Sequence, residues 1–300
     1  SQSARRSVSG GYGGGVPELP EVETVRRELE PWLVGRRILR AARADAPEGP
    51  KYAGLERAAG QRVEGVTRRG KFLLLPLSAG DELIIHLGMT GVLSPQRPER
   101  HLRAYLELEP QPAPGPNPAL YFRDPRRFGR FLVVPAGDYR SLPTLQALGP
   151  EPLGAALDAP GFAAALARSS TPVKTYLLGQ RPVAGVGNIY ADEALWRARI
   201  HPATPARALS RRKAGALLEA IREVLSASLA AQGTTLSDYR RVNGEVGAYR
   251  SELRVYGREG EPCPRCGAII AKITLGGRGT HLCPRCQRPP HTKLLYTKPL

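Results

Sequence analysis

The sequence lacks any long apolar stretch. Its 300 residues contain no run of about 18 apolar residues, the length that a membrane-spanning helix needs. Arg5 and Arg6 lie near the N-terminus without a following apolar segment, which excludes the pattern of a secretory signal peptide. Cysteine is also scarce, because only four occur and all lie between residues 263 and 286. These absences argue against a membrane protein and against an exported protein stabilised by disulfides.

Acidic residues are few in comparison with basic ones. Lysine and arginine total 44, and aspartate and glutamate total 27, which gives a formal net charge of +17. A chain this basic most often binds a polyanion, and nucleic acid is the first candidate. Arginine far outnumbers lysine, so an arginine-biased genome is the alternative explanation of the charge. The length and the hydrophobic fraction of 41% indicate a globular protein of about two domains.

Residues 1–16 differ in composition from the rest of the chain. They are rich in serine, glycine and arginine and show no apolar period, so we expect a disordered extension that does not belong to the native protein. A helical period begins directly after it, with apolar residues at Leu19, Val22 and Leu29, and we expect Pro31 to end that helix. The ordered protein is therefore expected to start just after the extension.

Strand patterns follow this first helix. Residues 71–77 and 82–87 flank a Ser-Ala-Gly-Asp turn, which predicts a β-hairpin. Residues 102–108 alternate apolar side chains with polar ones such as Arg103, which predicts a strand with one face toward solvent. Proline and glycine at 111–118 predict a loop. This part of the chain is therefore expected to be rich in β-structure.

A stretch rich in proline and glycine at 135–160 predicts a domain boundary. The period beyond it is helical, and we expect three helices, at 161–169, 190–199 and 210–231. A glycine-rich turn at 184–188 precedes the second of them. The second half of the chain is therefore expected to be helical up to the cysteines.

The four cysteines form two Cys-Pro-Arg-Cys motifs with sixteen residues between them. This spacing is typical of a site in which four thiolates hold one Zn²⁺ tetrahedrally and leave no open position. The expected ligands of one structural zinc ion per chain are Cys263, Cys266, Cys283 and Cys286. Two disulfides are the alternative, but they need an oxidising compartment. Residues 274–280, between the motifs, predict a hairpin with Arg278 near its tip. The side chain of Arg278 either enters a DNA groove or is simply solvated.

Two further motifs are suited to contacts with phosphates and bases. The turn 183–193 (VAGVGNIYADE) runs into a helix whose free N–H groups favour an anion, and Asn188 either caps that helix or donates to a phosphate. The motif 124–129 (DPRRFG) sets two arginines beside a phenylalanine, which suits a phosphate contact and an apolar wedge between bases. Taken alone, the first is also an ordinary helix start, and the second an ordinary turn before a strand.

Pro17 and the acids that follow it admit two readings. An N-terminal proline is a secondary amine, and an α-amino group is neutral closer to pH 7 than a lysine side chain is. Such an amine attacks a sugar carbon to form an iminium, with Glu18 and Glu21 beside it as proton donors and acceptors. The alternative is that acids in a first helical turn only complement the helix dipole.

Eight motifs occur along the chain in a fixed order. They are PELPEVET (17–24), RRGKFLL with Lys71, IIHLGMTG (84–91), DPRRFGR (124–130), GVGNIYADE (185–193), QGTTLSDY (232–239), VYGREGEPC (255–263) and the CPRC pair. Together they resemble the formamidopyrimidine-DNA glycosylases, the Fpg or MutM family, over about 17–288. The resemblance implies an α+β fold of two domains: an N-terminal β-sandwich opened by a helix, and a C-terminal helix–two-turn–helix region with a β-hairpin zinc finger. The implied boundaries are 17–148 for the sandwich, 149–250 for the helical region, 251–290 for the finger and 291–300 for a tail.

The resemblance also implies a function. It implies excision of oxidised purines, chiefly 8-oxoguanine and formamidopyrimidines, from double-stranded DNA, followed by strand cleavage by β,δ-elimination at the abasic site. A monomer in the bacterial cytoplasm, bound to the nucleoid through DNA, is implied as well. The implied catalytic residues are Pro17 as nucleophile, Glu18 as general acid, Glu21 and Lys71. The implied DNA contacts are His86, Met89, Arg126, Arg127, Phe128, Lys174, Asn188 and Arg278, and less surely Tyr256. The implied lesion-capping loop contains Val242, Asn243, Gly244, Gly247 and Tyr249.

Two departures from the family pattern bear on these expectations. Ala248 stands where the family often has an aromatic residue, which leaves the preferred base open, and an endonuclease VIII-like enzyme for oxidised pyrimidines is the second reading. Residues 1–16 would convert the nitrogen of Pro17 into an amide, which leaves a non-catalytic protein that binds damaged DNA as a further reading. We expect that Val16 marks an alternative start codon, or that the extension is a cloning leader. A zinc-finger transcription factor is disfavoured, because the sequence has one zinc motif and no dimerisation heptad.

Overall fold

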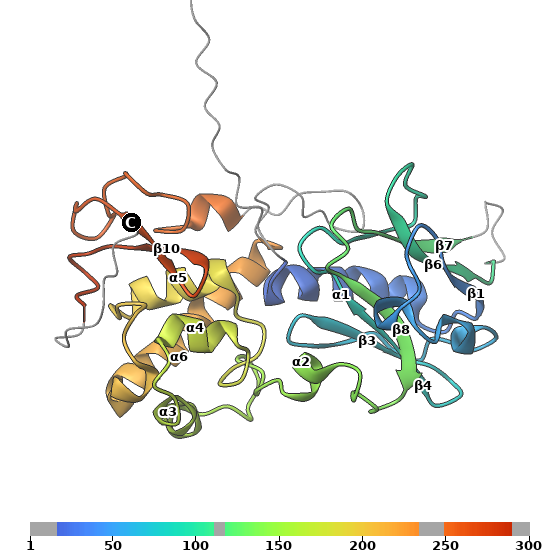
Figure 1. Cartoon of the computed structure of the whole chain (residues 1–300), viewed down its shortest axis with the longest axis horizontal. Coiled ribbons are helices and arrows are strands. Elements are labelled where there is room, and N and C mark those ends of the chain that lie inside the picture. The colour runs from blue at the N-terminus through green and yellow to red at the C-terminus, as the bar shows by residue number, and fades with distance from the viewer. Residues whose placement is uncertain (1–16, 111–117, 234–248, 290–300) are drawn as a thin grey trace, which may run out of the picture.

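The computed structural model describes residues 17–110, 118–233 and 249–289, which form two units that lie side by side (Figure 1). The first unit holds two sheets, a long helix and a short one, and the second holds helices and a two-stranded hairpin. No helix among these described residues is both long and apolar enough to cross a membrane. The expected α+β architecture is confirmed.

Helix α1 (Leu19–Leu33) opens the first unit. Pro20 lies in its first turn, where the missing N–H costs no hydrogen bond. The helix does not end at Pro31, so that expectation was wrong, and it continues to Leu33. A proline this close to a helix end removes only one hydrogen bond, whereas the last turn buries Leu33 completely in the core of the first unit.

Two antiparallel four-stranded sheets make up the rest of the first unit, in the orders β1-β6-β7-β5 and β2-β3-β4-β8. The strands are β1 (Ile38–Arg43), β2 (Thr67–Arg69), β3 (Phe72–Pro76), β4 (Asp81–His86), β5 (Val92–Ser94), β6 (Leu102–Leu108), β7 (Ala119–Arg123) and β8 (Arg130–Pro135). Short 3₁₀ turns lie at Pro50–Tyr52 and Leu55–Ala58. Both sheets and α1 contribute to one apolar core, and the expected hairpin is β3 paired with β4. The expected β-sandwich is confirmed.

One side chain in β6 departs from the expected alternation. The pattern predicts Arg103 on the solvent side, but only 7% of its surface is exposed. Its guanidinium donates to the backbone carbonyl of Asp124 at 2.8 Å and to that of Asp45. These hydrogen bonds compensate for burying the charge, and they attach the segment after β7 to the sheet.

Helices build the second unit. They are α3 (Ala159–Ala167), α4 (Val173–Leu178), α5 (Asn188–Arg197) and α6 (Arg211–Ala230), with 3₁₀ turns at Ala206–Ala208 and Tyr249–Glu252. The short helix α2 (Pro143–Gln146) precedes them and packs Leu145 on the β2-β3-β4-β8 sheet of the first unit. Strands β9 (Ala271–Leu275) and β10 (Arg278–Leu282) form the hairpin between the cysteine motifs. The three expected helices are α3, α5 and α6, whereas α2 and α4 are too short to show a period in the sequence.

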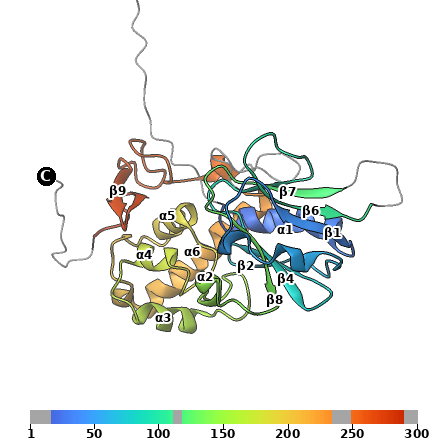
Figure 2. The same ribbon diagram turned by 45° about the vertical axis from the view of Figure 1, so that its right-hand side comes forward.

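The start of α1 packs into the second unit. Leu19 is completely buried in the apolar core of that unit, together with Val186 and Ile189. Its backbone N–H donates to the carbonyl of Gly185 at 3.1 Å. The first residues of α1 therefore lie at the N-terminal end of α5, at the junction of the two units, and both views show the start of α1 next to the helices of the second unit (Figure 2).

Candidate active site and nucleic-acid interface

A buried carboxylate lies at this junction. Glu18 directly precedes α1, and only 1% of its surface is exposed. Its oxygens accept hydrogen bonds from the N–H groups of Gly187 at 2.7 Å and Ile189 at 2.8 Å, at the N-terminal end of α5. The sequence predicted that this turn favours an anion, and the anion held here is the chain's own carboxylate.

The glycine-rich turn is shaped to bring backbone N–H groups to Glu18. A Cβ at Gly187 would lie 2.4 Å from Glu18 Cδ and 2.6 Å from Lys71 Nζ, so only glycine fits. Gln180 holds the turn from behind: its Oε1 accepts from the Gly185 N–H at 2.6 Å, and its Nε2 donates to the carbonyl of Val186. Gln180 is thus a positioning residue for the Glu18 site, and no sequence motif drew attention to it.

Burial changes the acidity of the groups in this site. Burial raises the pKa of Glu18 to about 7, although the positive charge of Lys71 and the N–H donors act in the opposite direction. Burial also lowers the pKa of Lys71 below its usual value, against the effect of the Glu18 carboxylate. The Glu18 carboxyl is therefore suited to donate and accept a proton near neutral pH.

A second carboxylate supports the first. Only 1% of Glu21 is exposed, and its Oε2 accepts from the backbone N–H of Glu18 at 2.9 Å. The hydroxyl of Tyr190 donates to Glu21 Oε1 at 2.6 Å and lies 2.6 Å from Ser228 Oγ. We call Glu18, Glu21 and Lys71 the carboxylate cluster. The structure brings these three predicted residues together, directly after the buried Pro17.

Two loops lie side by side where β4 ends and β8 begins, because His86 and Arg130 are paired in the sheet. We call residues 87–91 and 124–129 the recognition loops. A Cβ at Gly88 would lie 2.6 Å from the backbone nitrogen of Gly129, so the loops are in close contact. The predicted DNA contacts Met89, Arg126, Arg127 and Phe128 all belong to these two loops.

Asp124 holds the second recognition loop in place from inside. Its side chain is fully buried, with Oδ1 accepting from the Thr90 hydroxyl at 2.6 Å and Oδ2 from the Gly129 N–H at 2.8 Å. The Thr90 hydroxyl in turn accepts from the Arg126 N–H at 3.2 Å. Together with Arg103, these bonds fix the loop backbone. Sequence reasoning included Asp124 only as the first residue of the motif and did not predict the hydrogen bonds.

The tips of the loops are exposed in spite of this rigid base. Half of the Phe128 surface, 50%, is exposed, although the side chain is large and apolar. The guanidinium of Arg126 lies over its ring at 5.0 Å from the centroid. Arg127 adopts a left-handed backbone with φ of 56°, which costs energy for a residue with a side chain. An exposed aromatic on a fixed loop is suited to insertion into a partner.

His86 lies between the two sets of residues. Its ring packs on Phe72 with centroids 4.6 Å apart, and Nδ1 accepts from the Gly88 N–H at 3.2 Å. Burial, together with the charges of Lys71 and Arg130, lowers the pKa of His86 to about 4. The ring is therefore neutral at physiological pH, as its role of hydrogen-bond acceptor requires.

Lys174 lies in an environment that the sequence did not suggest. Its side chain has no exposed surface, and Nζ lies 2.8 Å from Asp192 Oδ1. The ammonium also donates to Thr280 Oγ1 at 2.7 Å and to the carbonyl of Gly279 at 3.1 Å. Lys174 therefore attaches α4 to β10 in this structure, and a direct phosphate contact would require β10 to move.

Asn188, Arg278 and Tyr256 surround the same hairpin. The Asn188 side chain donates to the carbonyl of Gly279 at 3.1 Å. Arg278 is exposed at the start of β10, as expected for a hairpin tip. The ring of Tyr256 packs edge-on against His281 with centroids 4.8 Å apart. The exposed guanidinium of Arg278 thus belongs to a hairpin that is hydrogen-bonded to α4 and α5.

Of the residues expected in the lesion-capping loop, only Tyr249 belongs to the described part of the chain. Four of its expected residues lie outside the described residues: Val242, Asn243, Gly244 and Gly247. Tyr249 is described, and only 1% of it is exposed. Its ring packs 6.1 Å from that of Tyr190 within the core of the second unit. Tyr249 therefore anchors the segment in the core rather than presenting its ring to a ligand.

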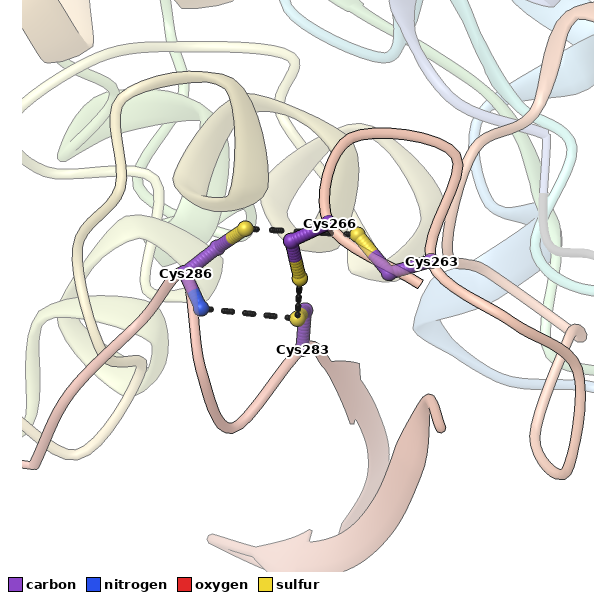
Figure 3. A group of neighbouring side chains, drawn as sticks. All are labelled: Cys263, Cys266, Cys283 and Cys286. Carbon is purple, nitrogen blue, oxygen red and sulfur yellow. Dashed lines mark hydrogen bonds between the residues drawn. The ribbon is translucent and has the colours of Figure 1, made fainter. Parts of the chain in front are cut away.

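The four cysteines converge as the spacing predicted (Figure 3). Their sulfurs all lie within 4.8 Å of one another, with Cys266 and Cys283 at 3.4 Å and Cys263 and Cys286 at 4.0 Å. A tetrahedral Zn²⁺ with Zn–S bonds of about 2.3 Å would place sulfurs roughly 3.8 Å apart, so the arrangement fits. None of the four is joined in a disulfide. This is a structural zinc site, and Trp196 Nε1 donates to Cys263 Sγ at 3.4 Å beside it.

Comparison with known families agrees with this geometry. The pattern described as the formamidopyrimidine-DNA glycosylase N-terminal domain matches residues 16–131, and the H2TH domain of the same enzymes matches 148–240. The zinc finger found in FPG and IleRS matches 260–289. The chain belongs to the formamidopyrimidine-DNA glycosylase family. It therefore shares the family's sandwich, helix–two-turn–helix region and zinc finger, and the expectation from the motifs is confirmed.

This chain aligns with nearly the whole length of individual relatives. The formamidopyrimidine-DNA glycosylase of Deinococcus radiodurans is 50% identical over 285 residues, covering 91% of this chain and 97% of that protein. The Thermus thermophilus protein is 49% identical over 274 residues, with 91% and 98% covered. The crystal structure of MutM (FPG) from Thermus thermophilus matches with a TM-score of 0.83, at 49% identity over 90% of this chain and 98% of that one.

Solved complexes of a more distant relative contain DNA. A point mutant of Lactococcus lactis FPG with Fapy-dG-containing DNA matches with a TM-score of 0.81, at 35% identity over 91% of this chain and 100% of that one. The same Lactococcus protein with DNA containing an abasic site matches with a TM-score of 0.78, at the same identity and coverage. In both complexes the partner of that protein is DNA with a damaged or missing base.

Proposed function

We propose that this family member is a bifunctional DNA glycosylase and AP lyase of base-excision repair, and that it removes oxidised purines from duplex DNA. One observation carries the proposal. The Glu18 carboxyl, directly after Pro17, is buried, is held by two N–H groups of α5 and has a pKa raised by burial to about 7. Such a group can act as a proton donor at a sugar next to an amine nucleophile.

The chemistry proposed for Pro17 requires a free secondary amine. Its nitrogen attacks C1′ of the damaged nucleotide and the N–C1′ bond forms. The glycosidic bond breaks as the base leaves with the bonding electrons and takes up the proton that the Pro17 amine gives up. The protonated Glu18 carboxyl gives its proton to the ring oxygen of the sugar, which opens to leave an iminium at Pro17. Loss of a C2′ proton then expels the 3′ phosphate, and a second elimination expels the 5′ phosphate.

An amide nitrogen cannot carry out this attack, because its lone pair is delocalised. We therefore propose that the catalytic form of the chain begins at Pro17, with Val16 standing at the position of an initiator methionine. Two observations support this. The family pattern begins to match at residue 16. Glu18 and Glu21, joined by a hydrogen bond, follow Pro17 directly, and Lys71 Nζ and Glu18 Cδ both approach Gly187.

The exposed loops supply the proposed recognition of DNA. A damaged nucleotide must leave the base stack to reach a buried carboxyl. Phe128 and Arg126 lie in contact on one recognition loop and Met89 belongs to the other, so these residues are suited to fill the gap that the nucleotide leaves, with Arg126 toward the unpaired partner base. Arg127, Arg278 and Asn188 are proposed to contact phosphates, and Lys174 to act through β10.

The substrate class is tested by excision from matched duplexes. The Pro17-initiated protein is incubated with duplexes that contain 8-oxoguanine, a formamidopyrimidine or an oxidised pyrimidine, and the products are resolved by length and end group. We expect excision of both purine lesions and strand ends with phosphates on both sides of the gap, as β,δ-elimination gives. Faster excision of the pyrimidine lesion would favour the endonuclease VIII-like reading. Tight binding of lesion duplexes without any excision would favour a damage-binding protein.

A further inference from the structure

A second concave surface lies at the opposite end of α5 from Glu18. It is a pocket of about 540 Å³ between the two cysteine motifs, the C-terminal end of α5 and the start of α6. Five cationic side chains line it: Arg199, Lys213, Arg265, Arg285 and Arg288. The other two lining residues are zinc-site cysteines, so no carboxylate faces the pocket among the described residues. A helix of ten residues is about 15 Å long, which separates this pocket from the carboxylate cluster.

Neighbouring side chains do not neutralise these cations. Among the described residues, Arg199, Lys213 and Arg288 make no side-chain hydrogen bond or ion pair, although Arg197 close by is paired with Glu223 at 3.2 Å. Four thiolates on Zn²⁺ carry a net charge of about −2, which is less than the charge of five cations. The pocket therefore keeps an excess of positive charge.

Two of the five cations are held in position. The guanidinium of Arg265 lies over the Trp196 ring, 4.0 Å from its centroid, and donates to the Trp196 carbonyl at 2.9 Å. Arg285 donates to the carbonyl of Cys266 at 3.0 Å. Fixed guanidinium groups lose little entropy on binding, so these two arginines form a preorganised base for the three unpaired cations.

The start of α6 adds an independent observation. Its first three residues are Arg211, Arg212 and Lys213, and its first turn holds no acidic residue. Cations at a helix N-terminus repel the positive end of the helix dipole, where most helices place acids. The chain thus accepts a local electrostatic cost at the edge of a pocket that is already cationic, and a bound anion would relieve it.

We propose that this pocket is a second phosphate-binding site, separate from the carboxylate cluster. Arginine forks match phosphate oxygens in geometry and charge, and the lining offers no apolar anchor for a peptide or a lipid chain. The phosphates come either from a free polyphosphate or from a stretch of DNA backbone away from the carboxylate cluster. The proposal does not depend on the chemistry at Pro17.

The first test is titration of the zinc-loaded full chain with tripolyphosphate, followed by calorimetry and by tryptophan fluorescence. The variant Arg199→Ser with Arg288→Ser removes two of the unpaired cations. A control variant, Arg168→Ser with Arg207→Ser, removes the same charge from exposed positions of the same unit. We expect the pocket variant to lose affinity for tripolyphosphate about tenfold or more, which corresponds to about 1.4 kcal/mol or more of binding free energy. The control variant should change about twofold or less.

The second arm identifies the source of the phosphate. Binding of undamaged duplexes of about 12 and about 40 base pairs is measured against salt concentration, because the slope counts phosphate contacts. If the salt slope of the pocket variant falls on the long duplex alone, the site binds DNA backbone. If the pocket variant loses affinity only for tripolyphosphate, the site binds a free polyphosphate. Equal losses in the pocket and control variants, or no loss in either, would overturn the proposal. Zinc content is measured in every variant, so that a damaged finger is recognised.

Discussion

The carboxylate cluster and the recognition loops differ in exposure: the first buries its functional side chains, and the second exposes them. Glu18 and Glu21 are each 1% exposed and are held by backbone N–H groups and a tyrosine hydroxyl. Phe128 is 50% exposed, although the backbone beneath it is fixed by buried Asp124 and Arg103. Burial is what moves a carboxyl pKa toward neutrality, whereas exposure is what lets a side chain enter a DNA duplex. Substitutions at the two places should therefore separate base excision from DNA affinity.

The largest effect is expected at the buried end. Glu18→Gln removes the ionisable proton but keeps the size of the side chain, so base excision should slow by about 10²–10⁴-fold. Affinity for lesion duplex should remain within a few-fold, because the recognition loops are unchanged. Single-turnover excision and equilibrium binding measure the two quantities. Glu82→Gln, a buried carboxylate of β4 that accepts from Tyr139, is the matched control and should excise normally. Excision of equal speed in both variants would contradict the role given to Glu18.

Zinc removal should affect binding rather than chemistry. Cys283→Ser removes one of four ligands, and a finger of this size folds only with its metal, so β9, β10 and Arg278 lose their fixed place. We expect DNA affinity to fall by about a hundredfold or more, with a salt dependence reduced by about one unit of log slope for each lost phosphate contact. A zinc-free protein that binds lesion duplex as tightly as the native one would refute this.

Phe128→Ala tests the exposed end directly. Truncation removes a stacking surface, and losses of about 1–3 kcal/mol are usual for aromatic–base contacts, so affinity for lesion duplex should drop about tenfold to a hundredfold. The free energy of unfolding should hardly change, because the ring is half exposed. Leu153→Ala, at a residue 41% exposed outside the loops, serves as control for loss of exposed apolar surface. An unfolding free energy that falls in step with affinity would mean that Phe128 is structural.

The smallest effect is a displacement of the pH profile. Because excision needs the protonated form of Glu18, the rate should decline as pH rises through about 7. The charge of Lys71 stabilises the ionised carboxylate and so lowers the pKa of Glu18. Lys71→Met should therefore move the declining limb to higher pH, whatever happens to the maximal rate. Lys272→Met, on exposed β9, should leave the limb in place. A limb that moves to lower pH in Lys71→Met would reverse the assignment.

Short-range patterns in the sequence predicted much of this arrangement. The cysteine spacing gave the zinc ligands, the period gave α3, α5 and α6, and the glycine turn gave an anion site at the start of α5. Long-range partners were out of reach, because no local pattern encodes them. Arg103 alternates like a solvent-facing residue and yet is buried under Asp124, and Lys174 finds its partners on β10, more than 100 residues away. The anion at the glycine turn likewise proved to be Glu18, 169 residues away from Gly187 in the chain.

The proposed chemistry is tested most directly by trapping the iminium. Protein that begins at Pro17 and protein that keeps residues 1–16 are each incubated with 8-oxoguanine duplex and borohydride, which reduces an iminium to a stable amine. We expect a covalent protein–DNA adduct, mapped to Pro17 by peptide mass, from the first protein and none from the second. Absence of an adduct from the Pro17-initiated protein, or an adduct at a lysine in both, would contradict it.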